Sequence, residues 1–148
     1  MQRASIIGRE FWDKAVELMG DSRHFVFWEI YQDLARCFLA QELEREALEA
    51  VRISLNAAEE LKSPEAVGKA WRVLGTIAAR LQKSVVYNAK EFTASECFTK
   101  SLHIFDEIKM EVEKGRTLRD FARYENKNGN LQKARKMMDE AEGIFTRL

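Results

Sequence analysis

The sequence is poor in the two residues that most often interrupt helices. It has one proline, Pro64, and seven glycines in 148 residues. Because both are disfavoured inside helices, their scarcity indicates a chain that is helical almost throughout. Long apolar runs are also lacking, and none approaches the roughly 20 residues that span a bilayer. With 46% apolar and 32% charged residues, the composition excludes disordered and membrane-embedded proteins.

Residues that carry out reactions or hold metals are few. Neither Cys37 nor Cys97 has a second cysteine or a histidine at metal-ligand spacing, and we expect both to be buried, reduced thiols. His24 and His103 have no nucleophile at a suitable distance along the chain, and we expect them to be surface or partly packed residues. A glycine-rich phosphate loop and an HExxH pair are both absent. The sequence therefore predicts no enzyme, no metal and no cofactor.

Neither sign of charge dominates, since 24 basic and 24 acidic side chains give a formal net charge of zero. The chain thus lacks the overall basic charge typical of proteins that bind nucleic acids or anionic lipids. The first residues, Met1 to Ile7, lack the apolar core of a signal peptide. We therefore expect a cytoplasmic protein with neither a nucleic acid nor a membrane as partner.

Small residues recur with a fixed period. They form three sets: Ala35, Gly75 and Ala122; Ala47, Ala94 and Ala134; and Ser54, Ser101 and Ala141. Each member of the second set follows its counterpart in the first by 12, 19 and 12 residues, and each member of the third follows the second by 7. Without seven extra residues in the middle copy, the period is 40 throughout. Two antiparallel helices approach closely only where side chains are small, so the pattern predicts repeated helix hairpins.

The second copy carries a family resemblance. Trp71, Leu74-Gly75, Ala94, Phe98 and Ser101 resemble the W–LG–A–F–A signature of the tetratricopeptide repeat, with Ala78 in place of an aromatic residue. The period is similar to that of the longer repeats in bacterial signalling ATPases, cyclases and transcription activators. The resemblance implies an all-α fold, a right-handed α-solenoid of antiparallel helix hairpins.

The repeat predicts about seven helices in a single domain over residues 1–148. We expect three complete repeats over 24–62, 65–110 and 115–147. Their helices are predicted at about 24–41, 44–62, 65–83, 91–110, 115–128 and 131–147. Residues 4–20 align with a second helix whose first helix is absent, which leaves Phe11 and Trp12 without a neighbouring repeat. We expect the chain to be a piece of a longer protein; the alternatives are that this helix is a cap or a dimer contact.

The first helices carry a candidate binding surface. In tetratricopeptide repeats, the side of the first helix that faces away from the core lines a concave groove. At about 100° per residue, fifteen positions fall on that side, of which eight are basic and one is acidic. The basic ones are Arg36, Lys69, Arg72, Arg80, Arg116, Arg119, Arg123 and Lys127. Arginine offers forked donors to carboxylates and phosphates, so the groove is predicted to bind an acidic ligand. The alternative is a solvated face whose cations pair with neighbouring acids.

The seven extra residues, 84–90, provide a second candidate. Seven residues are close to two helical turns, so both helices of the second repeat would lengthen by one turn. The alternative is a protruding apolar contact for a partner, made by Val85, Val86 and Tyr87.

Our leading hypothesis is a protein–protein interaction module or scaffold, part of a larger bacterial regulatory protein, that binds an acidic peptide segment in its basic groove. One alternative is a sensor domain for a small anionic effector. Another is a self-association module, a homodimer through the N-terminal helix. Gln32 and Arg36 do not reproduce the dicarboxylate clamp that some members of the family use on chaperone tails.

Overall fold

The computed structural model describes residue 10 and residues 27–148, and this part of the chain is almost entirely helical. The elements are α2 (Phe27–Ala40), α3 (Glu44–Glu60), α4 (Pro64–Leu81), β1 (Val85–Tyr87), β2 (Lys90–Phe92), α5 (Ala94–Glu107), α6 (Glu111–Lys127) and α7 (Leu131–Thr146). The all-α class is confirmed. The helix expected over 4–20, with Phe11 and Trp12, lies outside the described residues except for Glu10.

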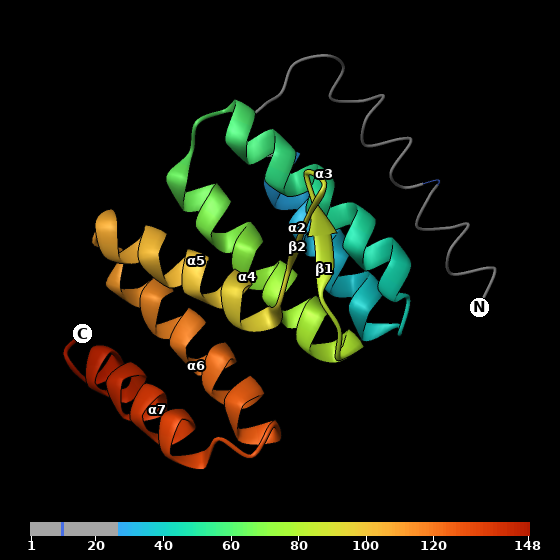
Figure 1. Ribbon diagram of the computed structural model, residues 1–148. Coiled ribbons are helices and arrows are strands. Elements are labelled where there is room, and N and C mark those ends of the chain that lie inside the picture. The colour runs from blue at the N-terminus through green and yellow to red at the C-terminus, as the bar shows by residue number, and fades with distance from the viewer. Residues whose placement is uncertain (1–9, 11–26) are drawn as a thin grey trace.

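The six helices lie side by side in chain order (Figure 1). Their most extensive contacts are within the pairs α2–α3, α4–α5 and α6–α7, and each pair packs against the next. The first helices of the pairs also meet, because α2 contacts α4 and α4 contacts α6. The outward sides of α2, α4 and α6, opposite their second helices, are called the first-helix face below.

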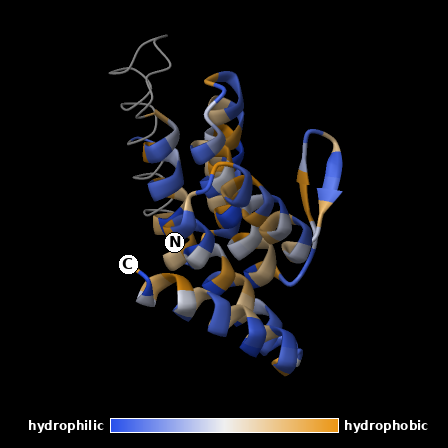
Figure 2. Cartoon of the chain, turned by 90° about the vertical axis from the view of Figure 1, so that its left-hand side faces the viewer, coloured by the Kyte–Doolittle hydropathy of each residue, from blue (hydrophilic) through white to orange (hydrophobic). Residues whose placement is uncertain are grey.

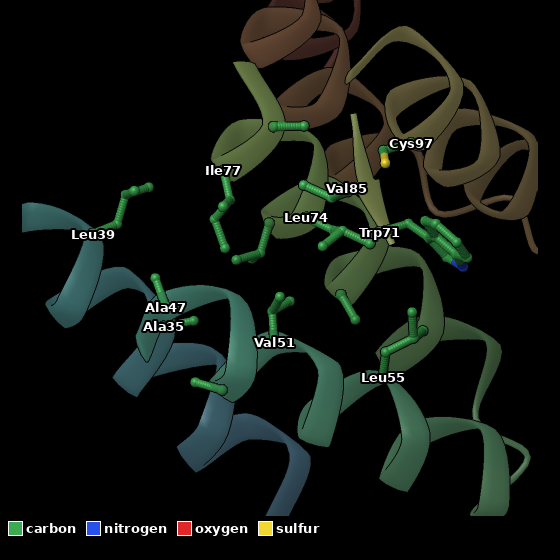
Figure 3. Packing of buried hydrophobic residues seen from close by; sticks show 14 of the residues in the cluster. Ala35, Leu39, Ala47, Val51, Leu55, Trp71, Leu74, Ile77, Val85 and Cys97 are labelled. Carbon is green, nitrogen blue, oxygen red and sulfur yellow. The ribbon is translucent and has the colours of Figure 1, made fainter. Parts of the chain in front are cut away.

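Small side chains occupy the contacts between helices, as predicted. All nine residues of the three repeating sets are buried. Ala35 of α2 and Ala47 of α3 lie together in Figure 3, while Val51 and Leu55 of α3 point towards α4. Gly75 lies so close to the Phe98 ring that a Cβ on it would be 3.0 Å from a ring carbon. The period therefore records where helix backbones approach each other.

Helix ends follow local signals where these exist. The Ser63 hydroxyl accepts a hydrogen bond from the Ala66 amide at 3.3 Å, and Pro64 takes the first position of α4. Helix α6 begins at Glu111, four residues earlier than predicted. The residue before it, Met110, makes no side-chain cap, so this start has no local signal in the sequence. Gly129, in the turn before α7, has a φ of 84°, a conformation that suits glycine.

The prediction that residues 84–90 lengthen two helices was wrong. Helix α4 ends at Leu81, and β1 pairs antiparallel with β2 in the register Val85–Phe92 and Tyr87–Lys90. The two loop residues, Asn88 and Ala89, both have positive φ, as a tight hairpin turn requires. Figure 2 shows this hairpin standing beside the helices.

The hairpin is anchored rather than free. The Trp71 ring lies 5.7 Å from the Tyr87 ring and 4.9 Å from the Phe92 ring, both edge-on. The Tyr87 hydroxyl donates a hydrogen bond to Glu59 Oε2 at 2.9 Å. Val85 and Tyr87 are buried and only Val86 is exposed, so the three residues do not form one protruding apolar contact.

Candidate functional site on the first helices

The eight predicted basic residues do not form one continuous free surface, because Arg72 is buried. Its Nη1 donates to Glu113 Oε2 at 2.8 Å and to the Glu113 carbonyl at 3.3 Å. Both side chains are only 7% exposed, and Arg116 Nη1 reaches the other Glu113 oxygen at 2.6 Å. Arg72 therefore joins α4 to α6 inside the protein, and its assignment as a groove residue is corrected.

The charges of this buried pair affect its titration. Burial by itself raises the pKa of Glu113, but the hydrogen bond and charge of Arg72, with the charges of Lys69 and Arg116, outweigh it. The pKa of Glu113 consequently lies below its ordinary value. Burial lowers the pKa of Arg72, which remains charged at neutral pH.

This shift predicts a loss of stability in acid. A carboxyl whose pKa is lower in the folded state contributes stability above its unfolded pKa, about 4.3 for glutamate. That stability is lost as the pH falls through the folded pKa. We expect the urea midpoint of the wild type to fall more steeply below about pH 4.3 than that of an Arg72→Met/Glu113→Leu variant. Equal pH dependence of the two proteins would contradict this assignment.

Besides Arg116, three other predicted basic residues have local partners. Lys69 Nζ contacts Glu65 at 2.9 Å and lies 5.5 Å from the Trp28 ring. Arg36 contacts Asp33 at 3.4 Å, and Arg119 contacts Asp120 at 3.4 Å. These pairs are partly or well exposed, and such pairs contribute little to stability. They leave the cations accessible to a competing ligand.

Three predicted residues, Arg80, Arg123 and Lys127, meet around one hollow between the C-terminal ends of α4 and α6. This basic hollow has a volume of about 230 Å³. It is lined by Thr76, Ala79, Arg80, Gln82, Phe98, Asp120, Arg123, Tyr124, Lys127 and Asn128. Phe98 is almost wholly buried and forms its floor, whereas Arg80, Arg123 and Lys127 are exposed at its rim.

Positive charge exceeds negative charge at this rim. Asp120 lies 3.7 Å from Arg123 and is the one acidic residue in the lining. Arg80 and Lys127 make no ion pair within the described part of the chain. A second hollow, of about 380 Å³, shares Tyr124 and Lys127 with the first and adds Lys83. The two together form a basic depression that has an apolar floor.

Sequence reasoning missed several residues of the site. Asp120 stands one residue after Arg119 and three before Arg123, a spacing at which helical side chains pair, so it was detectable. The rings of Phe98 and Tyr124, 6.2 Å apart, were assigned to the core or not singled out. Glu113 gave no local signal, since its main partner is 41 residues away.

The cysteines and histidines differ in their exposure. Cys97 is buried as predicted, and burial, followed by the charge of Glu96, raises its pKa to about 12. Cys37, however, is exposed, so the prediction of a buried thiol was wrong there. His103 is exposed and lies 3.2 Å from Glu107; His24 falls outside the described residues. Among the described residues no three His, Cys, Asp or Glu side chains are grouped to hold a metal ion.

No protein-family model matches the sequence, and no curated protein matches it significantly. Of the described helices, none combines the length and the apolar content needed to cross a bilayer.

Proposed function

We propose that this chain is a protein–protein interaction module whose basic hollow binds an acidic peptide segment. The observation that carries the proposal is the meeting of Arg80, Arg123 and Lys127 over the aromatic floor of one hollow. These cations come from the two neighbouring first helices α4 and α6. Exposed cations that gather in a depression attract carboxylates more strongly than the same charges on a flat surface.

The hollow's size and lining suggest the kind of peptide. Its volume of about 230 Å³ suits a single large side chain. Phe98, Tyr124 and Ala79 offer apolar contact, and the rim offers forked and single-point donors. We therefore expect an apolar anchor residue with glutamate or aspartate on either side, bound along the first-helix face.

The proposal includes the arrangement of the helix pairs in space. If the helix pairs build a right-handed solenoid of the tetratricopeptide type, the first-helix face is its concave surface. A scaffold without enzymatic activity, in the cytoplasm and within a larger bacterial regulatory protein, is the setting that the resemblance suggests. Neither nucleic acid nor membrane is proposed as a partner.

One observation favours a second candidate, a sensor for a small anionic effector. The predicted groove included Arg72, but Arg72 is buried, which interrupts the basic surface between Arg36 and Arg119. Three exposed cations, Arg80, Arg123 and Lys127, instead converge at one end of the face. A small molecule with two carboxylates or a phosphate would use the same donors.

Selection of displayed random peptides for binding to the immobilised full chain would test the proposal. We expect selected peptides to be rich in Asp and Glu around an apolar residue. An Arg80→Glu/Lys127→Glu variant should bind them at least tenfold more weakly, a change of about 1.4 kcal/mol. Binding to the wild type should weaken with added salt, because the rim is exposed.

The matched control is Arg45→Glu/Lys136→Glu, which makes the same charge change at exposed positions of α3 and α7. It should bind like the wild type. Neutral or basic selected peptides, or equal loss in both variants, would refute the peptide proposal. If short peptides fail but succinate or inorganic phosphate protects the wild type alone from thermal unfolding, the sensor is favoured.

A further inference from the structure

Helix α7 carries an apolar stripe on its outer side. Leu131, Met138 and Phe145 are 62%, 41% and 37% exposed, three of the five large apolar side chains that are exposed in the described residues. They are seven residues apart, so at about 100° per residue each lies about 20° from the next and all three fall within about 40° around the helix. These residues are called the α7 stripe.

The repeat shows what such positions do elsewhere. Met138 and Phe145 occupy the places of Phe98 and Phe105, 40 residues earlier, which are 1% and 0% exposed. The Phe98 ring stacks on Phe121 of the next helix pair at 5.2 Å. The position that α6 covers at Phe98 is therefore uncovered at Met138 of α7.

Two comparisons within the repeat indicate that the stripe is more than an exposed edge. Phe145 keeps its inner contact, because a Cβ on Gly115 would lie 2.9 Å from its ring, just as one on Gly68 would meet Phe105. Only its outer side is open. At the first position of α7 stands Leu131, where α3 begins with Glu44. An apolar residue replaces a charged one at the uncovered place, which favours a covering partner.

The charges beside the stripe suggest the identity of that partner. Arg135 and Glu142 lie along one edge of the stripe. Around the helix they are about 60° and about 40° from Met138, in the same direction. Both are exposed, and neither makes an ion pair with any described residue. If two α7 helices cross antiparallel at Met138, residue 135 of one faces residue 141 of the other. Each Arg135 then lies beside a Glu142, whereas a parallel pair would bring like charges together.

We propose that two copies of this chain associate through the α7 stripe, α7 against α7, antiparallel about a two-fold axis. Leu131 of each copy packs near Phe145 of the other, and Met138 lies at the axis. Such an interface is isologous and closes at two copies. A contact of one helix from each copy belongs among the small interfaces, below roughly 1,200 Å², so we expect weak and reversible association.

The contact uses other apolar residues than the basic hollow, although Arg123 lines both that hollow and the one beside the α7 stripe. It also differs from the homodimer predicted through the N-terminal helix. A neighbouring hollow of about 400 Å³ between α6 and α7, lined by Leu131, Ala134 and Met138, would receive side chains of the second copy. Self-association can therefore be measured without knowledge of any peptide ligand.

Sedimentation velocity of the full chain over a range of concentrations tests the proposal. We expect a monomer–dimer equilibrium that Met138→Glu weakens at least tenfold. The matched control Gln132→Glu adds the same charge on the same helix, about 120° away from Met138, and should leave the equilibrium unchanged. Circular dichroism would verify that each variant remains helical.

A charge exchange tests the antiparallel geometry. Arg135→Glu alone and Glu142→Arg alone should each weaken association, while a mixture of the two should restore it, because each unlike pair is re-formed. A monomeric wild type, or a dimer that Met138→Glu leaves intact, overturns the proposal; the latter would favour the N-terminal helix. Failure of the mixture to recover overturns the antiparallel pairing.

Discussion

Glu113→Ala should lower the free energy of unfolding by about 3–5 kcal/mol, because it leaves the buried Arg72 guanidinium without its carboxylate. Arg72 is 6% exposed, and its Nη1 donates to Glu113 and, at 3.4 Å, to Thr117 Oγ1. In the variant, Arg72 keeps as partners the main-chain carbonyl of residue 113 and the Thr117 hydroxyl, neither of which carries a charge. Urea unfolding followed by circular dichroism would measure the loss.

Two further variants separate the buried pair from surface charge. Replacing both partners, as in Arg72→Met/Glu113→Leu, should recover stability to within about 1 kcal/mol of the wild type, since apolar side chains of similar size need no partner. Arg116→Met removes a cation that is half exposed, and should cost less than about 1 kcal/mol. A Glu113→Ala protein as stable as Arg116→Met would show that the pair is solvated in solution.

The helical class was predictable because its evidence is periodic. Ala35, Ala47 and Ser54 recur in kind one period later, and each lies where two backbones approach. Such residues are constrained by their own helix pair, so the sequence alone places them. The helix ends were less accurate, as at Glu111, because an uncapped start leaves no local mark.

The first-helix face shows where sequence reasoning stops. Arg72 and Arg80 are eight residues apart on α4 and were assigned to the same face. One is buried against Glu113 of α6 and the other is exposed at the basic hollow. Helical spacing gives the direction in which a side chain leaves its helix. Whether an acid on another repeat meets it depends on the packing of the repeats.

The hairpin was missed for a different reason. Residues 84–90 were treated as a multiple of the helical turn, although Val85 and Val86 are β-branched and Asn88 tolerates positive φ. Three-residue strands are too short to show clear alternation. The contacts of Tyr87 and Phe92 with Trp71 stabilise the hairpin, and they are not visible in the local sequence.

The same repeat position should have unequal energetic weight in two repeats. Phe105→Ala is expected to cost about 3–5 kcal/mol, since the ring is fully buried and lies 5.7 Å from the Arg72 guanidinium. Phe145→Ala should cost less than half as much in dilute protein, because 37% of that residue is already exposed to water. Urea unfolding at low protein concentration would compare the two.

Concentration provides the control for this comparison. If α7 associates as proposed, the cost of Phe145→Ala rises with protein concentration, because only the wild type gains stability from the dimer. The cost of Phe105→Ala, measured in a Met138→Glu background that does not associate, should not change with protein concentration. The Phe105 ring has no exposed side and takes no part in the proposed contact. Equal costs for the two phenylalanines in dilute protein would mean that the outer side of Phe145 is already covered within the monomer.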